Sequence, residues 1–155
     1  MANFCWAVKA VSLTEQMENI KGLVQSYYKA LNEGTLDRFE AYVSADFMHH
    51  TPGVPAGWNA FKQVLMLNRQ GFANMTSTVE ALIAEGDQVV ARTTTRGTHT
   101  GSFFGHPPSG KSFTVTGMDM FRVVNGQLAE QWSVFDTVTL LQQLGLYASV
   151  NERGH

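Results

Sequence analysis

Residues 112–135 read SFTVTGMDMFRVVNGQLAEQWSVF, and this stretch predicts two antiparallel strands joined by a tight turn. β-Branched and aromatic residues recur with a period of two on both sides of Asn125-Gly126, which is the alternation of a half-buried strand. Asn-Gly is the strongest short-range signal for a two-residue hairpin turn. We therefore expect strands over Ser112–Val124 and Gln127–Phe135.

The residues around this hairpin predict two more strands and, ahead of them, a helical half. Ser12 and Glu15 have the spacing of a capping box at a helix start, and apolar residues follow at helical intervals as far as Gly34. Gly86-Asp87 marks a turn between two strand patterns. Besides the hairpin and the first helix, the expected elements are a helix over Leu36–Val43, a short strand over Asp46–His50, a helix over Trp58–Gln70, strands over Met75–Glu85 and Gln88–Thr100, and a last helix over Val138–Leu144.

Helices followed by an antiparallel meander predict an α+β fold, in which the N-terminal helices pack on one face of a curved antiparallel sheet. A sheet that curves around helices forms a cone with one open mouth, which is a natural central pocket for a small molecule. We expect one cone domain over residues 13–145, a loose N-terminal extension over residues 1–12 and a C-terminal tail over residues 146–155.

Composition narrows the classes of partner. Of the 155 residues, 44% are hydrophobic and 15% are charged, and the net charge of −2 gives no reason to expect nucleic acid or an anionic membrane as a partner. The low charge suggests that a second subunit covers apolar surface, so we expect a homodimer or homotetramer. Cys5 is the single cysteine, and the first residues lack the pattern of a signal peptide, so we expect a cytoplasmic protein.

The stretch GHPPSGKS at Gly105–Ser112 matches the letters of a phosphate-binding loop, but its context argues against that function. Such a loop needs backbone N–H groups around the phosphates and a helix start after them. Pro107 and Pro108 have no N–H group, and the residues after Lys111 predict a strand. We therefore interpret the stretch as a connection between two strands.

Several motifs are shared with one known family. They are Gly97-Thr-His-Thr-Gly101 with Gly105-His-Pro-Pro108, Arg122-Val-Val-Asn-Gly126, Gln143-Leu-Gly145, and, in the helical half, Ala30-Leu-Asn-Glu-Gly34, Ala45-Asp-Phe47 and Gly57 with Ala60-Phe61. In these motifs the chain closely resembles the SnoaL-like polyketide cyclases, which belong to the nuclear transport factor 2-like, or cystatin-like cone, superfamily. The likeness extends over about Ile20–Gly145.

The resemblance implies a cofactor-independent enzyme that closes a ring on a polyketide methyl ester by intramolecular aldol chemistry. It also implies an aspartate as acid and base, with a histidine nearby on the neighbouring strand. By counting from Asn125-Gly126 and Gln143-Leu-Gly145, the aspartate position holds Ser133 and the histidine position holds Asp119. A serine cannot replace a carboxylate as general base at neutral pH. Either the role has moved to Asp119 or Asp136, or this chain performs other chemistry, or none.

Asp119 is the first catalytic candidate on its own merits. It is the only charge in the run Phe113–Phe121, and a carboxylate on a mostly apolar strand is desolvated, which raises its pKa and makes it a better proton acceptor. The alternative is a carboxylate that is hydrogen-bonded to neighbours for structure. Strand alternation places Asp119 and Gly117 on one face, and the resemblance adds Ser133 and Gln131 to that face.

Two histidines are further candidates. His99 is expected to polarise a substrate carbonyl or, with Ser133 or Gln131, to bind a developing oxyanion, and the alternative is a histidine bonded to a threonine hydroxyl within the sheet. His50 matches a pocket-side position of the superfamily at the end of the first strand. His49 and His50 are adjacent and face opposite sides of a strand, so they cannot bind one metal ion together. We expect no metal and no cofactor.

Asp136 completes the catalytic candidates, although it is also placed to cap the last helix, and we favour the cap because aspartate is a preferred N-cap residue. The expected substrate-binding side chains are those of an aromatic pocket for a flat ring system, with ordinary core packing as the alternative. They are Tyr27, Trp58, Phe61 and Phe104, in addition to His50 and Gln131.

The sequence therefore predicts a cofactor-independent cyclase or isomerase that acts on a polyketide- or terpenoid-like small molecule by acid/base catalysis in an apolar pocket. One alternative is a non-catalytic small-molecule-binding or dimerisation module of the same fold. Another is an enzyme that opens an epoxide. Epoxide hydrolases of the superfamily, by resemblance, use an Arg-x-Asp pair on a strand, and the sequence contains no such pair.

Overall fold

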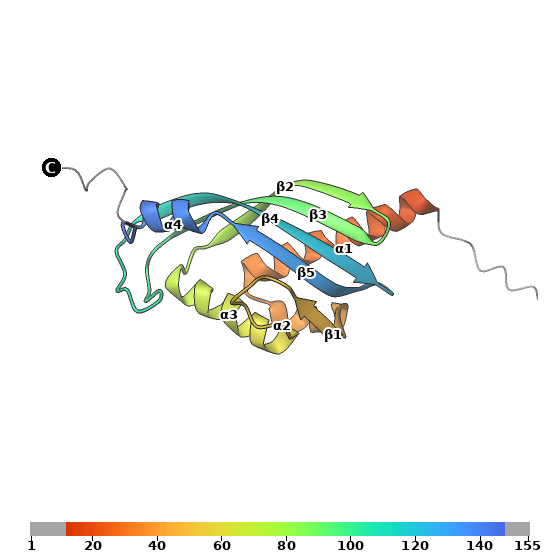
Figure 1. Cartoon of the computed structure of the whole chain (residues 1–155), viewed down its shortest axis with the longest axis horizontal. Coiled ribbons are helices and arrows are strands. Elements are labelled where there is room, and N and C mark those ends of the chain that lie inside the picture. The colour runs from red at the N-terminus through yellow and green to blue at the C-terminus, as the bar shows by residue number, and fades with distance from the viewer. Residues whose placement is uncertain (1–11, 148–155) are drawn as a thin grey trace, which may run out of the picture.

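The computed structural model of the chain describes residues 12–147, and the rest of the predicted extension and tail lies outside the described residues. In chain order, the elements are α1 (Leu13–Glu33), α2 (Leu36–Phe39), a 3-10 turn η1 (Glu40–Tyr42), β1 (Val43–His49), α3 (Trp58–Gly71), β2 (Thr76–Glu85), β3 (Gln88–Thr98), β4 (Ser112–Val124), β5 (Gln127–Phe135) and α4 (Thr137–Gln143) (Figure 1). In the described part of the chain, no helix combines the length and the apolar content that crossing a membrane requires.

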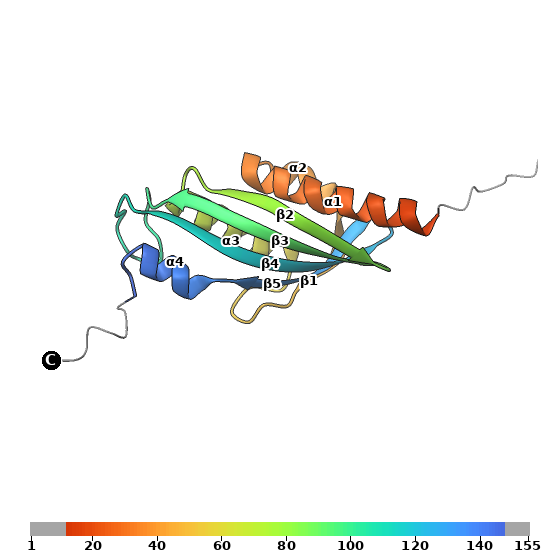
Figure 2. The same ribbon diagram turned by 90° about the horizontal axis from the view of Figure 1, so that it is seen from above.

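Helix α1 begins and ends where the sequence predicts. The Ser12 hydroxyl accepts a hydrogen bond from the backbone N–H of Glu15 at 3.1 Å, and Gly34 ends the helix in the left-handed conformation with φ 70°. The helix runs alongside β2, and its buried face includes Val24 and Tyr28 (Figure 2). This buried face packs α1 against the sheet and places tyrosine side chains in the interior.

The five strands form one curved sheet in the order β1-β5-β4-β3-β2. The pairs β2–β3, β3–β4 and β4–β5 are antiparallel, but β1 pairs with β5 in parallel, so the prediction of a wholly antiparallel sheet is wrong at this edge. A parallel pair needs a long connection, which α3 and strands β2–β4 supply here. The helices α1–α3 cover one face of this mixed sheet, which confirms the predicted α+β cone (Figures 1 and 2).

The helix predicted over Leu36–Val43 is shorter than expected. It ends at Phe39, and the chain continues as the 3-10 turn η1. Val43 already belongs to β1, because it is buried and pairs with Leu128 of β5. Sheet pairing and burial therefore override the helical pattern at the end of this segment.

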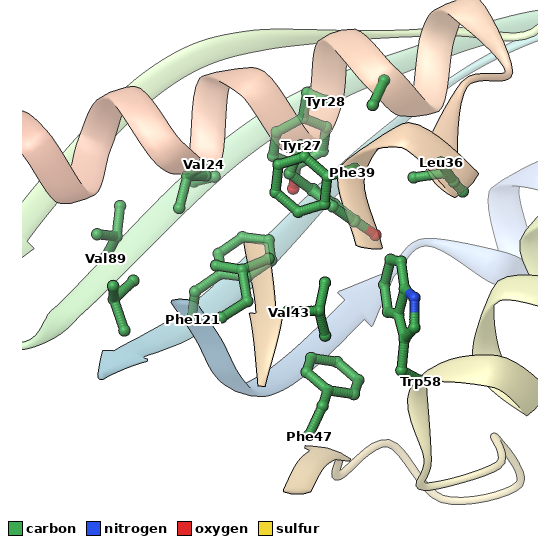
Figure 3. Close-up of a cluster of buried hydrophobic side chains, with 14 of the residues drawn as sticks. Val24, Tyr27, Tyr28, Leu36, Phe39, Val43, Phe47, Trp58, Val89 and Phe121 are labelled. Carbon is green, nitrogen blue, oxygen red and sulfur yellow. The ribbon is translucent and has the colours of Figure 1, made fainter. Parts of the chain in front are cut away.

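The buried apolar side chains form two separate clusters. The larger lies between the helices and the sheet, and Val24, Tyr27 and Phe121 meet near its centre (Figure 3). The smaller lies where the connection between β3 and β4 meets α4, and it consists of Phe72, Phe103, Phe113, Val115, Leu140 and Leu144. The two ends of the cone are thus packed independently.

The connection between β3 and β4 is held against the end of α3. The N–H groups of Thr100 and Gly101 donate to the carbonyl oxygen of Gly71 at 2.9 and 3.0 Å. A Cβ atom on Gly101 would lie 2.2 Å from the carbonyl oxygen of Gln70, so a side chain has no room there. This close approach explains the second glycine of the Gly97–Gly101 motif.

The phosphate-loop-like stretch has the structure that its context predicts. Strand β4 begins at Ser112, where a phosphate-binding loop would continue into a helix. The N–H groups of Ser109 and Gly110 donate to the Nδ1 atom and the carbonyl oxygen of His99, at 3.3 and 2.9 Å. These backbone donors are therefore used within the connection.

Candidate active site

Asp119 lies in β4 on the face that meets the helices. Phe121 is fully buried on the same face, whereas Met118 is 52% exposed on the other, as the alternation predicts. The β4–β5 register places Asp119 directly opposite Ser133 and Phe121 directly opposite Gln131. A bulge in this pair lies nearer the hairpin turn, so Asp119, Ser133 and Gln131 share one face, as expected.

Three side chains donate hydrogen bonds to the Asp119 carboxylate. The Tyr28 hydroxyl, from α1, donates to Oδ2, and the Ser133 hydroxyl, from β5, donates to Oδ1. The Nε2 atom of Gln131 also donates to Oδ1, at 3.2 Å. A carboxylate offers about four lone-pair positions, two on each oxygen. Oδ1 is therefore saturated, and Oδ2 keeps one position for a further proton donor.

The environment of Asp119 favours its protonated form more than water does. Burial raises the pKa of the carboxyl, and the hydrogen bonds from Ser133, Tyr28 and Gln131 offset only part of that effect. Burial, together with the nearby Asp119 charge, also raises the pKa of Tyr28, so Tyr28 remains a neutral donor. A carboxyl with a raised pKa can accept and return a proton closer to neutral pH.

His49 joins this group, although the sequence did not single it out. It is the last residue of β1 and is 4% exposed, with its ring packed on Phe61 at 4.1 Å between centroids. Its Nε2 atom lies 3.3 Å from the Ser133 hydroxyl oxygen. Burial, with a smaller effect of the adjacent His50, lowers the pKa of His49 to about 4, so its ring is neutral at pH 7.

The placement of His50 on the pocket side is wrong. His50 lies on the opposite face, where its ring stacks on Trp132 at 4.5 Å and its Nε2 atom is 2.9 Å from a Glu130 carboxylate oxygen. Neighbouring residues of a strand point to opposite faces. Because His49 points into the interior, His50 points outward.

His99 is buried but belongs to the other end of the cone. It contacts Phe72 and Phe103 of the smaller cluster, and its Nδ1 atom lies 3.0 Å from the Ser109 hydroxyl. Ala91 is the β3 residue that pairs with Asp119, and His99 follows it by eight positions, which is roughly 25 Å along an extended strand. The expectation that His99 acts together with the Asp119 group is therefore wrong.

Two more expected residues lie apart from Asp119. Asp136 is the N-cap of α4, with its carboxylate accepting the Thr139 N–H at 3.1 Å, as the capping interpretation predicts. Hydrogen bonds from the side chain and the backbone N–H of Thr139 lower the pKa of Asp136. Phe104 is 85% exposed in the connection between β3 and β4, at φ 45°, so its prediction as a pocket wall is wrong.

The remaining expected residues are buried in the larger apolar cluster. Tyr27 is 2% exposed and packs on Phe121, which pairs with Gln131 across the strands. Phe61 lies under the His49 ring, and Trp58 packs beside Phe61 at 6.3 Å between centroids. The tyrosines of α1 thus lie beside Asp119 and Phe121, whereas Phe61 of α3 packs on His49.

The described residues form clefts of about 370 to 420 Å³ on the helical side of the molecule. They lie between α1, α2 and α3, between α1 and β2, and between α1 and the β4–β5 turn. Tyr28 lines the cleft beside β2, but Asp119 lines none of these three, so the central pocket around Asp119 stays a prediction. Within the same residues, no three His, Cys, Asp or Glu side chains gather as a metal site would require.

The sequence model of the SnoaL-like polyketide cyclases matches residues 21–144. The chain belongs to the SnoaL-like polyketide cyclase family. Nogalonic acid methyl ester cyclase from Streptomyces nogalater is 28% identical over 120 residues, which span 75% of this chain and 90% of that protein.

Solved structures from two other Streptomyces species share the fold of this SnoaL-like chain. IdmH from Streptomyces antibioticus, a proposed polyketide cyclase, is 33% identical with a TM-score of 0.73 over 81% of this chain and 98% of that one. AclR from Streptomyces galilaeus, a proposed hydroxylase, is 26% identical with a TM-score of 0.78 over 85% of this chain and 99% of that one.

The family match confirms the resemblance inferred from the motifs. The expectation that Ser133 takes the position of the family aspartate, and Asp119 that of the histidine, stays a prediction. These two residues face each other across β4 and β5, with the serine donating to the carboxylate.

Proposed function

We propose that this protein is a cofactor-independent cyclase that closes a ring on a polyketide methyl ester, with Asp119 as acid and base. The Asp119 carboxylate carries the proposal, because its pKa is raised, three donors fix its position and one lone-pair position on Oδ2 stays free. Membership of the family supports ring closure, and the name of the Streptomyces nogalater relative suggests the methyl ester.

The proposed reaction is an intramolecular aldol addition. Oδ2 of Asp119 removes a proton from the carbon next to one carbonyl, and the carbanion attacks a second carbonyl of the same molecule. The new carbon–carbon bond forms as the carbonyl electron pair moves to its oxygen, and Asp119 returns the proton to that oxygen. No atom is gained or lost, and holding the chain folded supplies much of the rate.

Two buried polar atoms support a polar ligand in the interior. The indole N–H of Trp58 and the Oε1 atom of Gln131 have no hydrogen-bond partner among the described residues. Buried groups of this kind are few in native proteins and costly to leave unpaired. In the proposal, Trp58 donates to a substrate oxygen and Gln131 accepts from a substrate hydroxyl, while Tyr27 and Phe61 form apolar walls.

The proposed function is tested with nogalonic acid methyl ester and the purified protein, in the presence of a metal chelator. We expect a ring-closed product of unchanged mass by liquid chromatography and mass spectrometry, because aldol closure is an isomerisation. In D₂O, unreacted ester should gain deuterium at the acidic carbon if its deprotonation is reversible and the protonated Asp119 exchanges with the solvent.

Other outcomes would support the rival functions. Tight binding of the ester without turnover would favour a binding module. With epoxide substrates, a mass gain of one water molecule would favour epoxide opening, and a mass gain of one oxygen atom on the ester would favour hydroxylation. A heat-unfolded sample is the control for spontaneous closure.

We also propose that the protein forms a homodimer or a larger homo-oligomer through the outward face of the sheet. Ile83, Val90, Met120 and Trp132 pair in one continuous row across the four strands β2 to β5 on that face. Met118 and Val134 lie in the next row and are 52% and 75% exposed. An apolar area of this extent marks an interface more often than a wet surface.

Light scattering at micromolar concentration is expected to give at least twice the monomer mass of 17.1 kDa. Val134→Glu should weaken the assembly, because it places a charge within the apolar face. Leu67→Glu, at a 61% exposed position on α3, is the matched control and should leave the mass unchanged. A wild-type mass of one monomer would contradict the proposal.

A further inference from the structure

The proposed reaction does not use His49, yet the contacts of this side chain fix its chemical state. The backbone N–H of Thr51 donates to His49 Nδ1 at 3.2 Å, so Nδ1 carries the lone pair. The ring proton of the neutral imidazole is then on Nε2, which lies 3.3 Å from the Ser133 hydroxyl oxygen. His49 is therefore the donor of this hydrogen bond, and Ser133 is the acceptor.

The Ser133 hydroxyl is left with one direction for its proton. Its oxygen accepts from His49 Nε2 at 3.3 Å and from Gln131 Nε2 at 3.2 Å, which occupies both lone pairs. The proton of the hydroxyl points to Oδ1 of Asp119. A hydroxyl that accepts two hydrogen bonds is polarised and donates more strongly.

Thr51 also holds the backbone of Ser133 through its side chain. Its hydroxyl donates to the carbonyl oxygen of Ser133 at 3.1 Å and accepts from the Ser133 N–H at 3.1 Å. One residue thus sets the tautomer of His49 through its backbone and the position of Ser133 through its side chain. The end of β1 is built around the orientation of this serine.

We propose that His49 is a positioning residue that commits the Ser133 hydroxyl to Asp119 and so holds the carboxylate in its ionised, proton-accepting form. The inference rests on the proposed role of Asp119 as the base. All donors in the chain from Thr51 through His49 and Ser133 point toward Asp119, so the arrangement stabilises negative charge there and carries no proton away from it.

Few titratable groups face Asp119, so a pH-dependent change in its carboxyl signal can be assigned to Asp119 itself. Tyr27 and Tyr28 face it from α1, and burial raises the pKa of both hydroxyls, so they stay neutral. His49 faces the group from β1, and its lowered pKa of about 4 keeps it neutral at pH 7. The β3 partner Ala91 and the β5 partner Ser133 do not titrate. Among the described residues, Asp119 takes part in no salt bridge.

The test uses the carboxyl carbon signal of Asp119 in a ¹³C NMR titration of the protein without substrate. His49→Leu removes the donor and is expected to shift the Asp119 midpoint upward, because the carboxylate loses stabilisation. His49→Gln is the matched control, because its amide N–H can donate to Ser133, and it should restore the wild-type midpoint. In a Ser133→Ala background, the same His49→Leu change should produce no further shift.

This double-mutant cycle separates positioning from packing. Equal upward shifts from His49→Leu in both backgrounds would mean that the histidine acts through polarity or packing alone, and would overturn the inference. An ¹⁵N spectrum showing the proton on Nδ1 of His49 would overturn it as well. If His49→Leu unfolds the chain, His49→Gln and the tautomer spectrum still decide the question.

Turnover supplies an independent readout. At a pH below the midpoint of the acidic limb, kcat/KM of His49→Leu should be about three- to tenfold lower than in the wild type, the usual worth of one hydrogen bond, and the difference should shrink at higher pH. A loss of the same size at every pH would count against the positioning role. Should the ester not react at all, the proposed function fails, whereas the NMR titration still tests the contact between His49 and Asp119.

Discussion

The Asp119→Asn variant is expected to turn over about 10²–10⁴ times more slowly than the wild type, which is the usual contribution of general acid–base catalysis. Asparagine keeps the size of the side chain and one accepting oxygen, but it cannot take up a proton. The substrate contacts proposed for Trp58 and Gln131 remain, so KM should change little. Steady-state kinetics with the methyl ester measure both quantities.

Two variants serve as controls for Asp119→Asn. Ser133→Ala should cost less turnover, because the hydroxyl only donates to the carboxylate. Asp136→Asn makes the same chemical change at the exposed cap of α4, where asparagine caps nearly as well, so activity and melting temperature should stay close to wild type. Full activity in Asp119→Asn with a collapse in Asp136→Asn would move the chemistry to the end of β5. Full activity in both would mean that holding the substrate suffices.

Phe121→Ala is expected to lower the free energy of unfolding by about 3–5 kcal/mol, the usual cost of truncating a buried phenylalanine. The side chain is fully buried, and its ring lies 5.4 Å from that of Tyr27 and 6.1 Å from that of Tyr28 (Figure 3). Because helix α1 and the sheet meet on this ring, its loss leaves a cavity that neither side can easily fill. Urea unfolding followed by circular dichroism measures the change.

The matched control is Phe104→Ala, which removes the same atoms from a side chain that is 85% exposed. Its free energy of unfolding should change by no more than about 0.5 kcal/mol. A loss below 1 kcal/mol in Phe121→Ala would show that the centre of the larger cluster is loosely packed. A large loss in Phe104→Ala would show instead that this loop residue is covered in the assembled protein.

Local signals in the sequence were enough to predict the elements where they agreed with one another. Strands β4 and β5 have the predicted bounds, because a long alternation and Asn125-Gly126 specify the same hairpin. The start and end of α1 follow from Ser12 and Gly34 for the same reason. The sequence did not predict that β1 runs parallel to β5, because this pairing depends on residues far away in the chain.

The sequence predicted the candidate site only where it indicated which face of the sheet each residue points to. Asp119, Ser133 and Gln131 were placed together by the family resemblance. The turn alone would pair Asp119 with Trp132, and the bulge next to Arg122 brings Ser133 opposite Asp119 instead. His49 and His50 were exchanged, because β1 is short and a shift of one residue turns each side chain to the other face. Tyr28 was missed because the helical pattern assigned the interior to its neighbour, whereas α1 lies so close to the sheet that both tyrosines are buried.

The parallel pairing of β1 with β5 has a consequence for the order in which the chain folds. The contact between Tyr28 and Asp119 joins residues 91 positions apart, and that between His49 and Ser133 joins residues 84 positions apart. During synthesis, α1 and β1 leave the ribosome long before β5 exists, so their contacts with the hairpin are among the last to close, and long-range closures of this kind slow folding. The hydrogen-bonded group around Asp119 therefore forms only when the two ends of the fold meet. A fragment that lacks either end cannot form this group.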